Sequence, residues 1–223
     1  MFSKGYVYHD KIIKKIYPSR IEYVFLPSSR ESGFEEISGK TEKPTIKSEV
    51  ERISTSRIKA KIKDFSECND FQFFYTQTIS QNRFNLEDFK DTMQKKFKAY
   101  KRKNKDFIYL IIFEKHKNGA FHLHGLIGGV NTSDLYINNN GYLSLKFFDD
   151  IGFNSISKIK DKMKISNYIL KYITKDFQKT DSGYSYFHSK NLKVPICEII
   201  SSIPSNARII FENDYIKKWV VNK

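Results

Sequence analysis

The chain has 223 residues, of which 39% are hydrophobic and 15% aromatic, so it can build a sizeable core and is not a disordered chain. Its 39 Lys and Arg residues outnumber 25 Asp and Glu residues, and the formal charge of +14 favours a polyanionic partner such as nucleic acid over a solvated basic surface. No apolar run is long enough to span a membrane and no signal peptide is evident, so we expect a cytoplasmic protein with no membrane partner.

The two cysteines, Cys68 and Cys197, are far apart and form no CxxC spacing. This pattern favours a reducing compartment and argues against a metal held by cysteines.

Residues 1–66 are polar and rich in lysine, and they predict a basic N-terminal extension. Within them, residues 28–45 are rich in Ser, Gly and charge and predict a loop. The extension could contact DNA or complete the sheet of the main domain. We expect that main domain at 67–223, with a C-terminal extension.

The main domain begins with an alternation of strands and helices. Aromatic and β-branched runs predict strands, and Asn85 is a favourable N-cap for a helix ending near Tyr100. Strands are expected at 71–80, 107–114 and 120–129, shorter strands at 138–148 and 152–159, a second helix at 160–177, and a late apolar run at 207–211. This order predicts an α+β fold in which helices flank a central antiparallel sheet.

Two histidines one residue apart lie in the predicted strand GAFHLHGLIGG. Side chains alternate along a strand, so His122 and His124 share a face. They could be two half-buried structural histidines, or two imidazole ligands of a divalent metal.

The turn before this strand decides which side chain faces the histidines. A two-residue turn would place Lys115 opposite His122, whereas a three-residue loop ending at a left-handed Gly119 places Glu114 there. We predict the three-residue loop, which gathers Glu114, His122 and His124 into one cluster. His116 would share this face nearer the turn.

The second predicted helix carries two tyrosines four residues apart, Tyr168 and Tyr172, which therefore share a face. An apolar stripe lies nearly opposite them at helical spacing: Met163, Leu170, Ile173 and Phe177. Lys171 and Lys175 lie on the tyrosine side, where they could hold a phosphate. The tyrosines could be a surface pair covering nearby loops, or nucleophiles that attack a phosphodiester.

The first predicted helix ends in a lysine-rich stretch, KKFKAYKRKNK. It could track a single-stranded backbone, with Tyr100 stacking on a base, or it could be a solvated helix end. The residues assigned to DNA binding are Lys95, Lys96, Lys98, Tyr100, Lys101, Arg102 and Lys103.

These motifs occur in a known order. FYTQTIS (74–80) looks like the first motif of the HUH (His-hydrophobic-His) endonucleases, and HLH (122–124), with Glu114 upstream, resembles their metal motif. YILKYITK (168–175) is similar to the tyrosine motif of two-tyrosine rolling-circle replication initiators of small single-stranded-DNA phages and plasmids. SKNLKVP (189–195) resembles a segment that follows the tyrosine helix. The resemblance covers roughly residues 70–195.

The resemblance implies an endonuclease that holds Mg²⁺ or Mn²⁺ on His122, His124 and Glu114, although ligand chemistry alone also permits Zn²⁺. Tyr168 would attack single-stranded origin DNA and keep the 5′ phosphate, and Tyr172 would act second. Lys171 and Lys175 would neutralise phosphate charge. A host helicase and polymerase would complete replication.

The tyrosine motif departs from a simple pattern, because both tyrosines precede a lysine at the Tyr-x-x-Lys spacing. Asp176 resembles an acid of one-tyrosine initiators. The alternatives are a transposase or relaxase of the same superfamily, a non-catalytic nucleic-acid-binding protein with structural histidines, and a metal-dependent hydrolase that needs no tyrosine.

Overall fold

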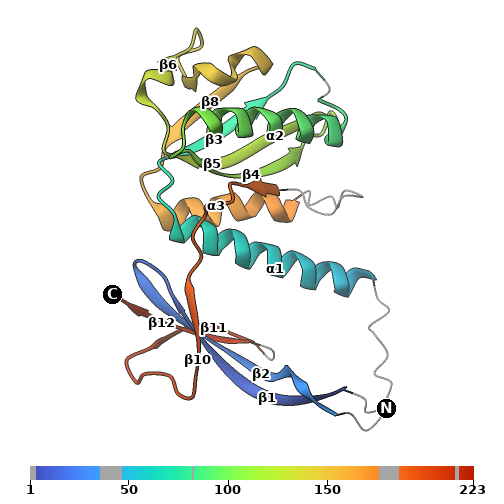
Figure 1. The fold of residues 1–223 in the computed structure, drawn as a ribbon, viewed down its shortest axis with the longest axis vertical. Coiled ribbons are helices and arrows are strands. Elements are labelled where there is room, and N and C mark those ends of the chain that lie inside the picture. The colour runs from blue at the N-terminus through green and yellow to red at the C-terminus, as the bar shows by residue number, and fades with distance from the viewer. Residues whose placement is uncertain (1–3, 36–46, 82, 176–185, 214–215) are drawn as a thin grey trace. The chain divides into compact units, whose positions relative to one another are not determined.

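In the computed structural model, the chain divides into two compact units (Figure 1). Unit 1 combines Met1–Val50 with Val194–Lys223, and unit 2 is Glu51–Lys193. The structure describes residues 4–35, 47–81, 83–175, 186–213 and 216–223, and for 4–9, 28–35, 47–54 and 172–175 it describes the backbone alone. The domain boundary placed at residues 66 and 67 stays a prediction, and it differs from this division.

Unit 1 is built on a five-stranded antiparallel sheet with the order β10-β1-β2-β12-β11. Its strands are β1 (Lys4–Ile16), β2 (Arg20–Glu35), β10 (Ile196–Ile200), β11 (Arg208–Glu212) and β12 (Lys217–Asn222). The N-terminal segment therefore pairs with the C-terminal strands and does not complete the sheet of unit 2. The loop predicted at 28–45 is wrong for 28–35, which continue β2, and its remainder, 36–46, lies outside the described residues.

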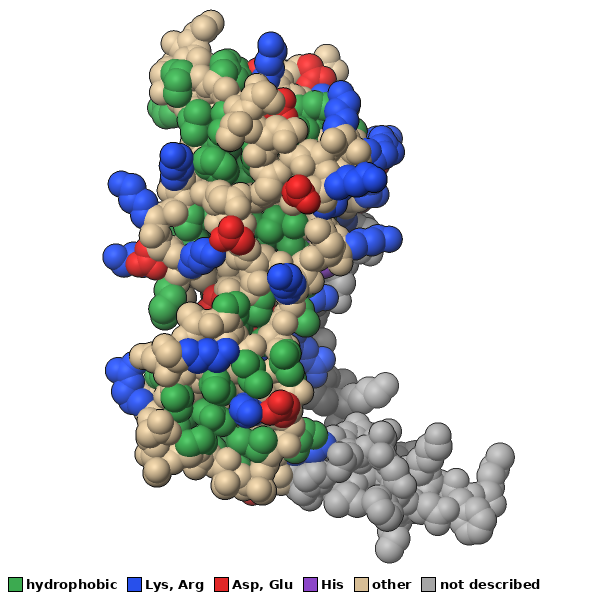
Figure 2. All heavy atoms as spheres, turned by 60° about the vertical axis from the view of Figure 1, so that its left-hand side comes forward, with side chains coloured by type: hydrophobic (Ala, Val, Ile, Leu, Met, Phe, Trp, Pro, Cys, Tyr) green, Lys and Arg blue, Asp and Glu red, His purple; other side chains and the backbone are tan. Residues whose placement is uncertain are grey.

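A buried ion pair anchors one end of the unit 1 sheet. Arg20 donates to Glu22 at 3.1 Å, both side chains are less than a tenth exposed, and the guanidinium lies over the ring of Tyr17. Several apolar side chains of this sheet remain at the surface, as the green atoms of Figure 2 show. They include Ile196, Ile199, Ile209, Ile210 and Phe211.

Unit 2 confirms the predicted α+β class. Its strands are β3 (Phe73–Thr78), β4 (Ile108–Lys115), β5 (Phe121–Gly128), β6 (Leu135–Ile137), β7 (Leu143–Leu145), β8 (Asn154–Lys158) and β9 (Tyr186–His188). Its helices are α1 (Lys47–Cys68, which begins in unit 1), α2 (Leu86–Lys103) and α3 (Lys162–Lys175). The main sheet is antiparallel throughout, with the order β8-β3-β5-β4-β9.

The short elements between β5 and β8 differ from the prediction. The strand expected at 138–148 is limited to β7, which pairs with β6, and Lys146–Ile151 form a 3-10 helix. The strand expected at 152–159 is confirmed as β8.

Each face of the main sheet is covered by different helices. Asn85 caps α2 by accepting from the backbone N–H groups of Glu87 and Asp88, as its sequence predicts. Helix α2 buries Phe89, Met93 and Phe97 on one face, against an aromatic core that includes Tyr75. Helices α1 and α3 cover the opposite face (Figure 1).

The second core, between the sheet and helices α1 and α3, contains Ile58, Ile62 and Phe65 of α1 and Ile169 of α3. The hydroxyl of Ser66 donates to that of Ser166 at 2.7 Å and ties the two helices together. Helix α1 was not expected from the sequence, although its buried residues follow helical spacing.

The apolar stripe predicted for α3 needs correction. Met163 is 60% exposed, whereas Ile169 and Ser166 are buried and Leu170 is partly buried. At about 100° per residue, the buried face is therefore rotated toward the tyrosines, and Tyr168 flanks it and does not lie opposite to it. The side chain of Ile173 and the position of Phe177 lie outside what is described.

Candidate catalytic site

The hairpin between β4 and β5 has the predicted register. Glu114 pairs with His122, and Ile112 pairs with His124. The loop contains three residues and ends at Gly119, whose φ is +87°. The N–H of Gly119 donates to the carbonyl of His116 at 2.8 Å. This confirmed loop places Glu114, His122 and His124 on one face of the sheet.

His124 is the best-ordered polar group on this face. Its Nε2 lies 2.9 Å from Oε2 of Glu114, its Nδ1 lies 3.2 Å from Oγ1 of Thr76, and the residue is only 9% exposed. Since a carboxylate only accepts, Nε2 of a neutral His124 donates to Glu114 and Nδ1 accepts from the hydroxyl. Burial lowers the pKa of His124 and favours that neutral ring.

His122 lies beside His116, which shares the face as predicted. The two rings are stacked with centroids 3.6 Å apart, and Nε2 of His116 is 3.7 Å from Glu114. Burial, followed by the charges of His116 and His124, lowers the pKa of His122 to about 4. A neutral imidazole keeps a lone pair on one nitrogen, which is the form that binds metals.

The donor types on this face fit a divalent cation, because two neutral imidazoles and a carboxylate suit Mn²⁺, Mg²⁺ or Zn²⁺. Within the described ranges, however, no three His, Cys, Asp or Glu side chains are arranged to hold an ion. The groups that a cation would need from Glu114 and His124 are bonded to each other. A metal at this site therefore stays a prediction.

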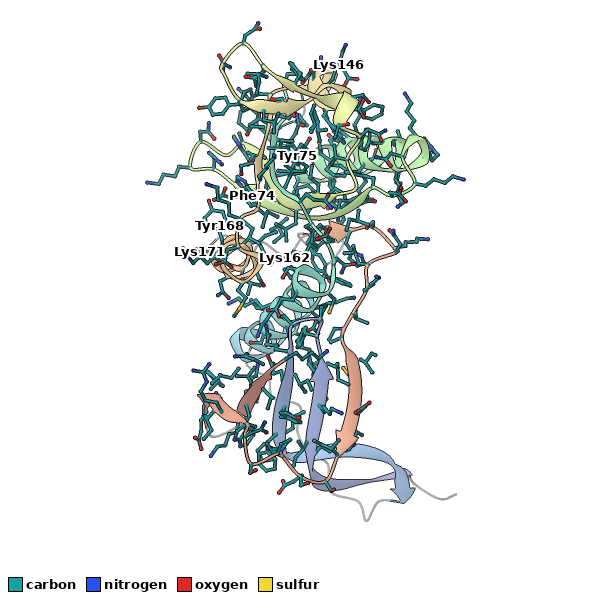
Figure 3. The ribbon with its side chains drawn as sticks, turned by 90° about the vertical axis from the view of Figure 1, so that its left-hand side faces the viewer. Phe74, Tyr75, Lys146, Lys162, Tyr168 and Lys171 are labelled. Atoms are coloured by element: carbon teal, nitrogen blue, oxygen red, sulfur yellow. The ribbon has the colours of Figure 1, made fainter. Side chains whose placement is uncertain are left out.

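Tyr168 is brought to the histidine face by Phe74. The Phe74 ring packs edge-on against Tyr168 at a centroid distance of 5.3 Å and stacks on His124 at 5.8 Å. Figure 3 shows Phe74 and Tyr168 on the α3 side of the sheet, with Tyr75 on the other side. Tyr168 is 41% exposed, and Nζ of Lys171 lies 5.7 Å from the centre of its ring.

The second half of the predicted tyrosine motif cannot be placed. Tyr172 and Lys175 belong to α3, but their side chains lie outside what is described, and Asp176 lies outside the described residues altogether. Their roles remain predictions.

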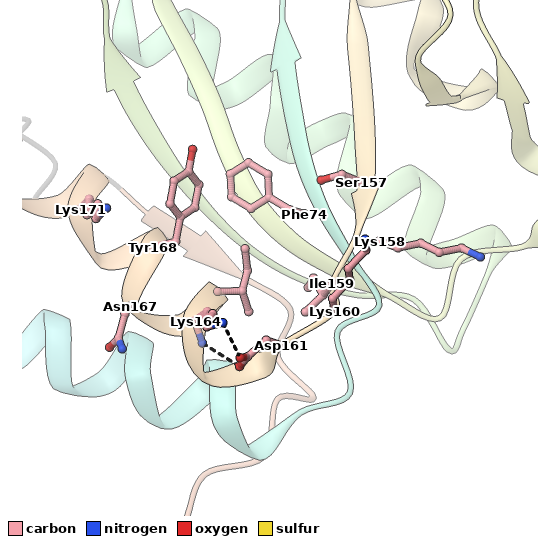
Figure 4. A pocket seen from close by; sticks show the side chains of 11 residues that line it. Phe74, Ser157, Lys158, Ile159, Lys160, Asp161, Lys164, Asn167, Tyr168 and Lys171 are labelled. Atoms are coloured by element: carbon pink, nitrogen blue, oxygen red, sulfur yellow. Dashed lines mark hydrogen bonds and ion pairs between the residues drawn. The ribbon is translucent and has the colours of Figure 1, made fainter.

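A pocket of about 640 Å³ opens beside Tyr168 (Figure 4). Its lining joins β8, the following turn, the first turns of α3 and one residue of β3. The lining residues are Phe74, Ser157, Lys158, Ile159, Lys160, Asp161, Lys164, Ile165, Asn167, Tyr168 and Lys171. It thus combines two aromatic rings with four lysines.

The basic stretch assigned to DNA binding lies on the other side of the sheet. Helix α2 packs on the face opposite the histidines, so its lysines do not line the site. The stacking role predicted for Tyr100 is wrong, because the ring is 1% exposed and its hydroxyl donates to Asp134 at 2.6 Å.

Several basic residues of this stretch are held by the protein itself. Lys96 pairs with Asp150 at 2.6 Å, and Lys101 donates to the carbonyls of Lys105 and Phe107. The ammonium of Lys103 lies over an aromatic ring of the 3-10 helix. The remaining three, Lys95, Lys98 and Arg102, are exposed, and Lys95 forms an ion pair with Asp91 one turn earlier.

Comparison with protein families gives one match. Residues 72–177 match the family model of the replication-associated proteins of the ORF2 type. This segment contains β3, the histidine pair and the tyrosine helix, which are the elements that form the candidate site. Comparisons with curated proteins and with solved structures returned no match. No described helix is long and apolar enough to cross a membrane.

Sequence reasoning missed the contribution of Phe74 and of the pocket lysines. Phe74 opens the motif FYTQTIS, but nothing in the sequence alone says that its ring contacts both His124 and Tyr168. The lysines did leave a signal, because Lys158, Lys160, Lys162 and Lys164 alternate at the entrance to the tyrosine helix.

Proposed function

We propose that this protein is a replication initiator that nicks single-stranded origin DNA through a tyrosine and a divalent cation, in the cytoplasm of its host. The observation that carries the proposal is the contact of Phe74 with both Tyr168 and His124. It brings the predicted nucleophile next to the predicted metal ligands, from elements far apart in the chain. The match to a replication-associated family supports the same function.

In the proposed reaction, Oη of Tyr168 attacks the scissile phosphorus and loses its proton. A bond forms between the tyrosine oxygen and phosphorus, the bond from phosphorus to the 3′ oxygen breaks, and that oxygen takes up a proton. Lys171 neutralises charge on the phosphate. A cation on Glu114, His122 and His124 would polarise the phosphate and stabilise the charge that develops on it.

The product is a 5′ phosphate linked to Tyr168 and a free 3′ hydroxyl that can prime synthesis. Tyr172 is one helical turn from Tyr168, so it is placed in sequence to attack the regenerated junction in the next round. The first strand would then be closed by its own 3′ end. Unwinding and synthesis would come from host enzymes.

One observation favours a second candidate, a basic nucleic-acid-binding protein with structural histidines. His124 is buried and bonded at both ring nitrogens, which is how a structural histidine is satisfied. This candidate requires neither a metal nor a tyrosine for its function.

Labelled origin DNA on a denaturing gel separates the two candidates. The proposal predicts a protein-linked DNA band with Mn²⁺ that is absent with a chelator and in His124→Ala. Cleavage without a linked band would indicate a hydrolase, and intact binding without cleavage would favour structural histidines. Tyr142→Phe, an exposed tyrosine on the loop before β7, is the control and should keep full activity.

A further inference from the structure

We propose that the pocket beside Tyr168 binds the DNA strand next to the scissile phosphate, with its lysines on the backbone and its rings beside a base. The inference rests on the proposed function, because it takes Tyr168 as the nucleophile. It replaces the basic end of α2 as the principal contact for DNA.

The position of the pocket supports this assignment. Phe74 and Tyr168 line it, and Phe74 also stacks on His124, so the pocket and the histidines meet at one ring. Ile159 and Ile165 extend the apolar part of its wall. A volume of about 640 Å³ lies within the range of small-molecule sites. A strand lying in it would pass directly beside Tyr168.

The charge of the pocket favours an anion. Lys158, Lys160 and Lys164 are exposed along its lining, with Lys171 at the tyrosine end. The opposing carboxylate, Asp161, lies 3.7 Å from the ammonium of Lys164 and accepts from two backbone N–H groups of the first turn of α3 at 3.0 Å. Because this single carboxylate caps the helix and faces four lysines, the pocket keeps a surplus of positive charge for phosphates.

The aromatic part of the pocket suits an unpaired base. Single-strand binding proteins combine a basic groove that follows the backbone with aromatic rings on which bases stack. Phe74 and Tyr168 are the only aromatic side chains in the pocket lining, and Figure 4 shows them next to each other. Bases in a duplex are already stacked, so this arrangement favours a single strand.

The test compares two triple variants that remove equal charge from opposite faces of the sheet. Lys158, Lys160 and Lys164 are changed to Gln in one protein, and Lys95, Lys98 and Arg102 in the other. Binding to a fluorescent single-stranded oligodeoxynucleotide is measured by anisotropy over a range of salt, with EDTA present so that no cleavage occurs. Each lost phosphate contact reduces the salt slope by about 0.7, so the pocket variant should lose about 2 and the α2 variant nearly nothing.

The base contact is tested separately with 2-aminopurine placed at successive positions of the oligonucleotide. Wild type should quench the probe at one or two positions, and Phe74→Leu should lose that quenching while its salt slope stays unchanged. Equal slopes for the two triple variants, or a larger loss in the α2 variant, would overturn the proposal.

Because binding is measured without cleavage, the two proposals fail separately. A protein that forms the linked band but shows equal slopes has the proposed function without this DNA site. A protein that shows the slope difference but no linked band binds DNA in the pocket without nicking it.

Discussion

The ring of Phe74 packs edge-on against the ring of Tyr168, with centroids 5.3 Å apart. Phe74 belongs to β3 and Tyr168 to α3, so this contact joins the tyrosine helix to the sheet. On its other side Phe74 stacks on His124. A single apolar residue thus fixes the separation between the predicted nucleophile and the predicted metal ligands.

Replacing Phe74 should therefore impair nicking more than folding. Phe74→Leu keeps apolar volume in the core but removes the flat ring that contacts Tyr168, and misplacement of a nucleophile by about 1 Å can lower a rate about 100-fold. We expect the linked band to form about 10- to 100-fold more slowly, with the thermal midpoint nearly unchanged. An unchanged rate would show that Phe74 does not position Tyr168.

Removing the carboxylate of Glu114 should weaken cation binding. Calorimetric titration with Mn²⁺ should show at least about a tenfold lower affinity for Glu114→Gln and for His124→Gln, because each loses a ligand. His188→Gln is the matched control, since His188 lies on β9 and its ring contacts the backbone of Ser189, away from Glu114. A wild-type protein that binds no Mn²⁺ would contradict the ligand set.

Gly125, directly after the histidine pair, should tolerate no larger side chain. A Cβ at this position would overlap Cδ1 of Ile111 and lie 2.7 Å from the carbonyl oxygen of Leu110. The backbone oxygen cannot move without disturbing the ladder between β4 and β5. We expect Gly125→Ala to lower the free energy of unfolding by about 1–3 kcal/mol, measured by denaturant titration. Wild-type stability would show that the strands can separate at no cost.

Tyr100 should make the protein sensitive to alkali. Burial and the hydrogen bond to Asp134 raise the pKa of Tyr100 from about 10 to about 12. The unfolded chain therefore loses its proton first, and this contribution to stability is present below pH 10 and lost between pH 10 and 12. Wild type should lose more unfolding free energy over that interval than Tyr100→Phe. Parallel curves for the two proteins would contradict the assignment.

The histidine hairpin was predictable because its geometry is local. The period of two along β5 and the left-handed Gly119 in a three-residue loop together fix which side chain faces His122. Nothing outside residues 108–128 was needed for that register.

The features that sequence missed depend on contacts between distant elements. The N-terminal strands pair with β10 and β12, close to the other end of the chain, and no local pattern specifies that pairing. Tyr100 looked like an exposed member of a basic run, but helical spacing from Phe97 and Met93 turns it into the core. The buried face of α3 is set by what α1 and the sheet offer, and so Ser166, bonded to Ser66, is inside while Met163 is outside.

The most direct test of the central claim is to locate the DNA on the protein. The linked species formed with Mn²⁺ is treated with nuclease and trypsin, and the peptides are analysed by mass spectrometry. Cleavage after Lys164, Lys171 and Lys175 separates ISNYILK, which contains Tyr168, from YITK, which contains Tyr172. We predict a nucleotide remnant on Tyr168 after a first nick. A remnant on Tyr172 alone would reverse the order of the nucleophiles, and cleaved DNA with no modified tyrosine would contradict the mechanism.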